Sequence, residues 1–148
     1  WYIARQLQHF KKGVRGANPK DTYGMQMRPM SMTLANEQAI ADVSAYVNSL
    51  DGPISETTIK GDVTAGKASY MVCVSCHGAN GEGNKDLNAP KLSGMQDWYI
   101  ARQLQHFKKG IRGANPKDTY GMQMAPMAMT LPDNKAIENI AAYISTLR

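Results

Sequence analysis

Apolar residues recur every three or four positions through much of the chain, a spacing that places them on one side of a helix. In residues 97–111 the apolar stripe with helical spacing consists of Ile100, Leu104, Phe107 and Ile111. A helix is therefore predicted there, with Asp97 as its capping residue and its end near Gly110. A last helix is predicted from Pro132, because proline favours the first helical turn. Its apolar side consists of Ile137, Ile140, Ala141, Ile144 and Leu147.

The rest of the pattern is helical or irregular. A run rich in small residues, 65–74, is predicted to lead as a helix into the cysteines. No useful length of alternating apolar and polar residues is present, so the predicted fold class is all-α. Two stretches, 78–94 and 113–130, are rich in turn residues and are predicted to be loops. Loops of that length need packing surface, which a cofactor can supply.

The chain contains a repeat with a period of 97 residues. Residues 1–50 align without gaps with residues 98–147, and 36 of the 50 positions are identical. Such a period matches a small domain, so tandem duplication is the natural interpretation. The predicted organisation is the C-terminal half of a first domain in 1–50, a linker in 51–60 and a complete domain in 61–148. We expect about 47 further residues, the period less the first copy, to precede Trp1 in the natural protein.

The composition and charge of the chain indicate which cofactors and partners it can bind. Aromatic residues make up only 7% of the chain, which is few for small cores unless a large flat cofactor fills them. The net charge is +5, and residues 98–148 contain seven Lys and Arg against three Asp and Glu. One face is therefore expected to be positive and to steer an acidic protein partner. The chain has no long basic run and no basic-aromatic interleaving, which argues against nucleic-acid binding.

The two cysteines, Cys73 and Cys76, are followed directly by His77 in the sequence CVSCH. Thiols at i and i+3 lie on one side of a helical turn, so both can bond to one edge of a porphyrin while His77 lies beneath the iron. This pattern is that of c-type haem attachment. A thioredoxin-like dithiol would need a βαβ setting, and a structural zinc site would need four ligands. We therefore predict one covalent haem c in this chain, with His77 as an axial ligand.

The second axial ligand is predicted to be a methionine. The segment before the last helix contains Met122, Met124, Met127 and Met129. Methionines that fill a core normally lie along a helix face, so in a predicted loop at least one of these should bind the iron. A His/Met pair raises the reduction potential and fills both axial positions. That favours an electron carrier over an enzyme.

With these features in place, residues 61–148 resemble a class I cytochrome c domain, and the chain is most similar to the two-domain, di-haem bacterial cytochromes of the c-four group. The resemblance is carried by AGKASYMVCVSCHGANGEGN, APKLSG, WYIARQLQHFKKGIR, the methionine segment and AAYISTL. It implies a tandem class I cytochrome c fold whose first domain is incomplete here. It also implies that Gly66 and Tyr70 pack against the last helix near Ile140 and Tyr143.

The resemblance further implies which residues hold the haem. The carbonyl of Pro90 should accept a hydrogen bond from the second ring nitrogen of His77, and Leu92 should contribute to the haem site. In this family the methionine ligand lies seven residues before the leucine that precedes the last helix. That spacing selects Met124, with Met127 as the alternative.

Three more residues are candidates at haem sites. Arg112 and Tyr120 could donate hydrogen bonds to haem propionates, although a surface role is an equal alternative for both. In the first copy, Met27 corresponds to Met124. We expect Met27 to bind the iron of a second haem in the intact protein.

The implied function is electron transfer without catalysis. The chain is expected to be a periplasmic carrier that passes single electrons between a cytochrome bc-type complex or dehydrogenase and a terminal oxidase or reductase of a respiratory chain. The alternative is an electron-entry domain or subunit of a larger respiratory complex at a membrane. The periplasmic location follows from the resemblance, because bacteria attach c-type haem outside the cytoplasmic membrane. The surface that docks acidic redox partners is expected to comprise Lys108, Lys109, Arg112 and Lys117.

Overall fold

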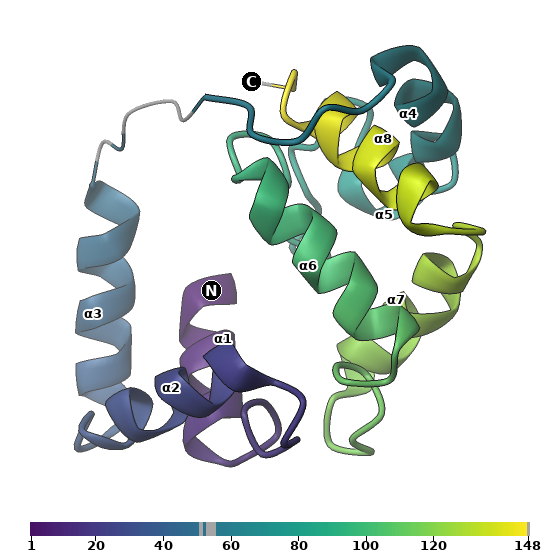
Figure 1. Cartoon of the computed structure of the whole chain (residues 1–148). Coiled ribbons are helices and arrows are strands. Elements are labelled where there is room, and N and C mark those ends of the chain that lie inside the picture. The colour runs from purple at the N-terminus through teal and green to yellow at the C-terminus, as the bar shows by residue number, and fades with distance from the viewer. Residues whose placement is uncertain (51, 53–55, 148) are drawn as a thin grey trace. The chain divides into compact units, whose positions relative to one another are not determined.

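The structure is a computed structural model that describes residues 1–50, 52 and 56–147, so part of the predicted linker lies outside it. These residues form helices and one isolated β-bridge, and none of them forms a strand, which confirms the all-α fold class (Figure 1). The helices are α1 (Tyr2–Lys11), α2 (Thr22–Met32), α3 (Glu37–Ser49), α4 (Val63–Tyr70), α5 (Val74–His77), α6 (Asp97–Lys108), α7 (Thr119–Met129) and α8 (Asn134–Ile144). Among the described helices, none has the length and apolar character needed to cross a membrane.

The helices divide into two compact units. The first contains α1, α2 and α3 together with Asn115–Asp118. In it α1 packs against α2 and α3, and its buried hydrophobic residues are Phe10 and Ile40. Asp21 caps α2 by accepting a hydrogen bond from the Gly24 amide at 3.0 Å, which satisfies one of the open donors at the helix start.

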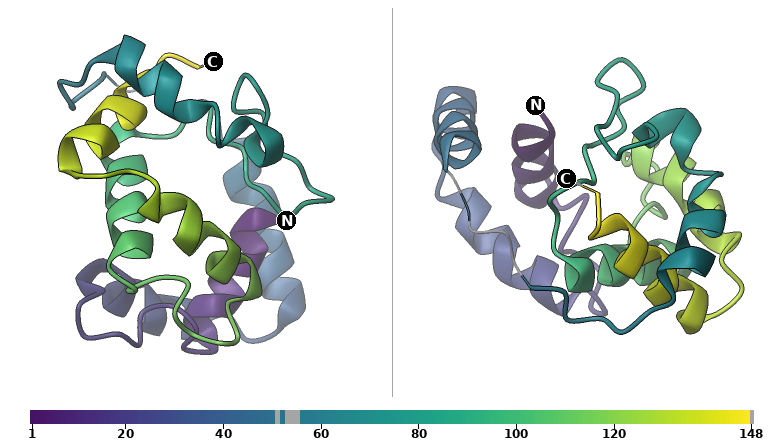
Figure 2. Two further views of the ribbon diagram at one scale, coloured as in Figure 1. Left: turned by 90° about the vertical axis from the view of Figure 1, so that its right-hand side faces the viewer. Right: turned by 90° about the horizontal axis from the view of Figure 1, so that it is seen from above.

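The second unit contains α4 to α8. Helix α8 packs on α4 and α6, and α6 also packs on α7 (Figure 2). The core of this unit consists of Tyr70, Ile100, Ala101, Leu131, Ile137, Ile140, Ala141 and Ile144. The predicted apolar side of the last helix is thus confirmed as its buried side, with Leu147 partly buried against the same cluster.

Helices α4 and α8 cross at a glycine. A Cβ atom on Gly66 would lie 2.0 Å from the backbone oxygen of Asn139, so only a glycine permits this approach. The rings of Tyr70 and Tyr143 meet with their centroids 5.3 Å apart, and Tyr70 and Ile140 belong to the same core cluster. The predicted packing of Gly66 and Tyr70 on the last helix is confirmed.

Two predicted helix starts are wrong. Helix α6 begins at Asp97 itself, and the Asp97 carboxylate accepts hydrogen bonds from the backbone amides of Thr58 at 2.6 Å and Ile59 at 2.7 Å. Asp97 therefore ties an upstream segment to α6 instead of capping the helix. Helix α8 begins two residues after Pro132, because Asp133 is its cap and accepts a hydrogen bond from the Ala136 amide at 2.8 Å.

The segment 113–130 was predicted to be a loop, but most of it forms α7. Gly121 and Pro126 lower helix propensity, and they made the segment look irregular. Small residues on one side of α7, Gly121 and Ala128, are buried where the helix packs on α6, and this packing outweighs the low propensity. The other predicted loop, 78–94, contains only turns and the isolated bridge between Asn84 and Ala89.

Candidate functional site

The cysteine pair lies at the short helix α5, which follows α4 along the chain. Asp62 caps α4 by accepting hydrogen bonds from the amides of Thr64 at 2.9 Å and Ala65 at 3.0 Å. After α4 ends, the Cys73 amide donates to Tyr70 at 2.8 Å and the His77 amide donates to Cys73 at 2.9 Å. Residues 73–77 therefore form one tight helical turn, which sets the positions of both thiols relative to the histidine.

His77 is buried and oriented by the backbone. Its side chain is 5% exposed, and its Nδ1 lies 2.8 Å from the carbonyl oxygen of Pro90, so the predicted hydrogen bond is present. A carbonyl can only accept, so Nδ1 carries the proton and Nε2 keeps its lone pair. Burial lowers the pKa of His77, and the bond to Pro90 only partly opposes this. The ring is thus neutral at neutral pH, the state in which imidazole binds a metal.

The loop after His77 folds back so that Pro90 reaches the ring. The Gly83 amide donates to the His77 carbonyl at 2.8 Å, and the Leu92 amide donates to Gly81 at 2.7 Å. Gly83 has a φ of +80°, and a Cβ atom there would lie 2.5 Å from the backbone nitrogen of Lys91. Glycine is therefore required where the two sides of this loop meet.

Cys73 does not have the lowered thiol pKa of a redox-active dithiol. Burial, and secondarily the neighbouring Cys76, raises the pKa of the Cys73 thiol to about 11. Catalytic dithiols need a lowered pKa, because the thiolate is the attacking species. Within the described ranges, no group of three or more His, Cys, Asp or Glu side chains is arranged to hold a metal ion. Two thiols beside a neutral, oriented imidazole fit the donor set of a covalently attached haem.

The four methionines of the predicted loop are carried by α7. Met122, Met127 and Met129 are exposed, between 43% and 60%. Met124 is half-buried, and it lies three residues from buried Gly121 and four from buried Ala128. That spacing places Met124 on the side of α7 that faces the interior of the unit. The helix therefore distinguishes Met124 from its neighbours in a way that a loop would not.

The remaining predicted haem contacts have different surroundings. Arg112 is 6% exposed, donates to Oε1 of Gln103 at 2.6 Å, and lies 4.4 Å from the centre of the Phe107 ring. Tyr120 is 37% exposed, and Leu92 packs partly buried against the core cluster. Their contacts with a haem stay predictions.

One of the four residues predicted for the positive docking surface, Arg112, is buried, which contradicts that part of the prediction. Lys108 is half-buried, and its ammonium donates a hydrogen bond to the Leu131 carbonyl. Lys109 and Lys117 are exposed. The roles of Lys108 and Asp97 were missed by the sequence analysis; a lysine in the last turn of a helix is the available signal for the first.

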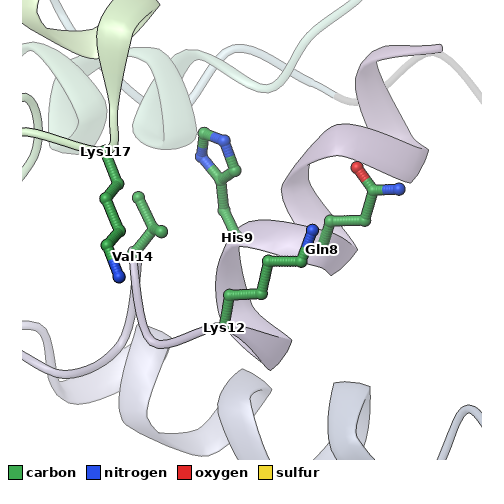
Figure 3. A pocket seen from close by; sticks show the side chains of 5 residues that line it. All are labelled: Gln8, His9, Lys12, Val14 and Lys117. Atoms are coloured by element: carbon green, nitrogen blue, oxygen red, sulfur yellow. The ribbon is translucent and has the colours of Figure 1, made fainter.

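In the first unit, Met27 lies on α2 and is 39% exposed. A hollow in this unit is lined by Gln8, His9, Lys12, Val14 and Lys117 (Figure 3). None of the residues that line it is a predicted haem-binding residue.

Comparison with known proteins matches this chain to one family. The sequence model of the Cytochrome c family matches residues 63–148. The cytochrome c4 of Azotobacter vinelandii is 33% identical over 157 residues, which cover 99% of this chain and 72% of that protein. The structure of Acidithiobacillus ferrooxidans cytochrome c4 aligns with a TM-score of 0.77 and 26% identity, covering 99% of this chain and 84% of that one. A thiosulfate dehydrogenase (TsdBA) from Marichromatium purpuratum aligns with a TM-score of 0.74 and 30% identity, covering 99% and 31%.

Proposed function

The chain belongs to the cytochrome c family, as a c4-type class I cytochrome that carries covalent haem c and transfers electrons, and from this premise we propose that His77 and Met124 are the axial ligands of its haem. The single observation that carries the proposal is the His77 ring, buried and held by Pro90 with Nε2 as the available donor. The two thioether bonds are assigned to Cys73 and Cys76, the only cysteines of the chain.

The bound haem would supply a one-electron couple at its iron. The other contributions to the site come from backbone and side-chain groups of the protein. The Pro90 carbonyl holds the proton on Nδ1 of His77 and fixes the ring orientation. A thioether from Met124 on the other side would raise the reduction potential and complete the axial pair. With both positions filled by protein groups, the site favours electron transfer over chemistry at the metal.

The assignment of Met124 is tested by replacing each candidate in turn. Met124→Ala should convert the low-spin spectrum to high-spin and lower the reduction potential, because one axial ligand is lost. Met127→Ala, which changes an exposed side chain on the same helix, serves as the control and should leave both unchanged. If Met127→Ala produces the spectral change and Met124→Ala does not, the assignment is wrong.

A second haem site is proposed for the first unit, with Met27 as its methionine ligand. The support is the correspondence of α2 with α7, including the methionine position itself. The cysteines for such a haem are not among residues 1–50. They would therefore belong to a segment outside this unit.

The proposed place of the chain is the periplasm, where it would pass electrons between a bc-type complex or dehydrogenase and a terminal oxidase or reductase. Covalent haem attachment supports this location, and the exposed Lys109 supports an acidic redox partner. The second candidate is an electron-entry unit of a larger complex. It is favoured by the alignment with the thiosulfate dehydrogenase, of which this chain covers only 31%. Co-purification of a dehydrogenase or oxidase subunit from native membranes would favour the second candidate.

A further inference from the structure

Lys108 connects the end of α6 to the chain just beyond α7. Its Nζ donates a hydrogen bond to the carbonyl of Leu131, two residues after α7 ends. Leu131 is 4% exposed and belongs to the core cluster, and Lys108 is half-buried. A bond from an ammonium is about twice as strong as a neutral one, and a cation is favoured near a helix C-terminus. The bond thus fastens the end of α7 to α6.

The start of α7 is held from the same side. Gly113, which follows α6, has a φ of +75°, and a Cβ atom there would lie 2.3 Å from the backbone oxygen of Gly121. The turn at Gly113 therefore rests directly on the first part of α7. Met124 lies between these two points of attachment, on the side of α7 that carries Gly121 and Ala128.

The first unit repeats both contacts at the corresponding positions. The Lys11 ammonium donates to the Leu34 carbonyl, and a Cβ atom on Gly16 would lie 2.2 Å from the backbone oxygen of Gly24. Residues 12–34 and 109–131 differ at only three positions, so the sequence that forms this tether is shared by the two copies. It is therefore a feature of the helix pair that carries the methionine.

We infer that Lys108 is a positioning residue for the methionine ligand: it keeps segment 109–130 closed against α6 and so keeps Met124 in place. The inference rests on the proposed ligand Met124. The bond joins the two ends of this segment, and without it the open state gains conformational freedom. An external ligand that competes with methionine binds only to the open state, so its apparent affinity reports how often the segment opens.

The test is imidazole binding to the oxidised holoprotein. Lys108→Met should raise the apparent imidazole affinity about tenfold, which corresponds to about 1.4 kcal/mol. Lys109→Met removes the same charge from the adjacent exposed residue and should leave the affinity unchanged. Lys108→Arg, which keeps a charged donor, should have an apparent imidazole affinity close to that of the wild type. Hydrogen exchange of the α7 amides in the reduced holoprotein should rise in Lys108→Met alone.

These results test the role of the Lys108 hydrogen bond separately from the assignment of Met124 as the methionine ligand. Equal imidazole affinity and equal α7 exchange in Lys108→Met and Lys109→Met would overturn the inference, whatever Met124→Ala shows. A tenfold rise in Lys108→Met combined with loss of the methionine spectrum only in Met127→Ala would support the tether and reject Met124 as the ligand. If Lys108→Met does not retain haem, Lys108→Gln, which replaces the charged donor with a neutral one, should give a smaller rise in both measurements, and no rise in either would overturn the inference.

Discussion

The carbonyl of Pro90 decides which nitrogen of His77 is available to a metal. The sequence contains the motif CVSCH, and this predicts attachment, but the hydrogen bond at 2.8 Å depends on a loop that returns to the ring. Only the family resemblance, not the residue pattern, indicated Pro90. Asp97 shows the opposite case. Its position before an apolar stripe suggested a cap, and its contacts with Thr58 and Ile59 are too distant in sequence to be predicted from local spacing.

Asp97 predicts a pH dependence of stability. Burial raises the pKa of its carboxyl, but hydrogen bonds from Ile59, Thr58 and Trp98 lower it more, to below the ordinary 3.8. The folded state therefore binds this proton more weakly than the unfolded chain does. The stabilisation is complete above the ordinary pKa, and the free energy of unfolding should fall as pH drops through the lowered pKa.

Denaturant unfolding of the holoprotein at several pH values below neutral measures this dependence. Asp97→Asn should be less stable than wild type near neutral pH and should lose less stability on acidification, since the titrating group is gone. Asp86→Asn removes an exposed carboxylate and should retain the wild-type slope. Parallel pH curves for wild type and Asp97→Asn would contradict this assignment.

At the scale of elements, helix faces were predicted well and helix ends poorly. The apolar stripe of α8 is buried as expected, because a period of 3.6 residues is visible in the sequence. The start of α8 depends on which side chain accepts the first free amides, and several residues nearby could do so, whereas α6 begins at Asp97 without a side-chain hydrogen bond from its N-cap residue. Helix α7 was missed entirely, since Gly121 and Pro126 oppose it locally and its stability comes from packing on α6.

The α4–α8 crossing predicts a large cost for one added methyl group. Gly66→Ala would place Cβ 2.0 Å from the Asn139 oxygen, which is backbone and cannot rotate away. The two helices would have to separate, so we expect a loss of about 3 kcal/mol in the free energy of unfolding. Gly52→Ala is the control, because its Cβ would meet no atom within 4 Å, and it should change stability by less than about 0.5 kcal/mol. Chemical denaturation of both variants as holoproteins checks the difference.

At the scale of the whole molecule, the two copies of the repeat share an apolar pattern but differ in how much of it is buried. Val47 in the first unit is 43% exposed, whereas its counterpart Ile144 in the second is 2% exposed. The two helices have the same apolar spacing, but only the second unit contains α4, which covers that face. The sequence pattern therefore predicts which face can be buried. What buries it depends on an element elsewhere in the chain.

Net charge leads to a prediction about electron exchange with partners. The chain carries +5 overall, and an uneven positive field raises the encounter rate with an acidic partner while adding little to the strength of the complex. The bimolecular rate of electron exchange with an acidic redox protein should therefore fall as ionic strength rises, because salt screens charges beyond about 10 Å at 0.1 M. Stopped-flow reduction across a series of salt concentrations measures this slope.

Two charge-reversal variants test which surface causes the salt dependence of electron exchange. Lys109→Glu should flatten the salt dependence and slow the reaction at low salt, because Lys109 is exposed next to the end of α6, beside the segment that carries the methionines. Lys67→Glu makes the same change in net charge at an exposed residue of α4 and should have the smaller effect. Equal effects of the two variants would mean that net charge alone steers the encounter. A rate that does not respond to ionic strength in the wild type would reject electrostatic steering altogether, and with it the proposed acidic partner.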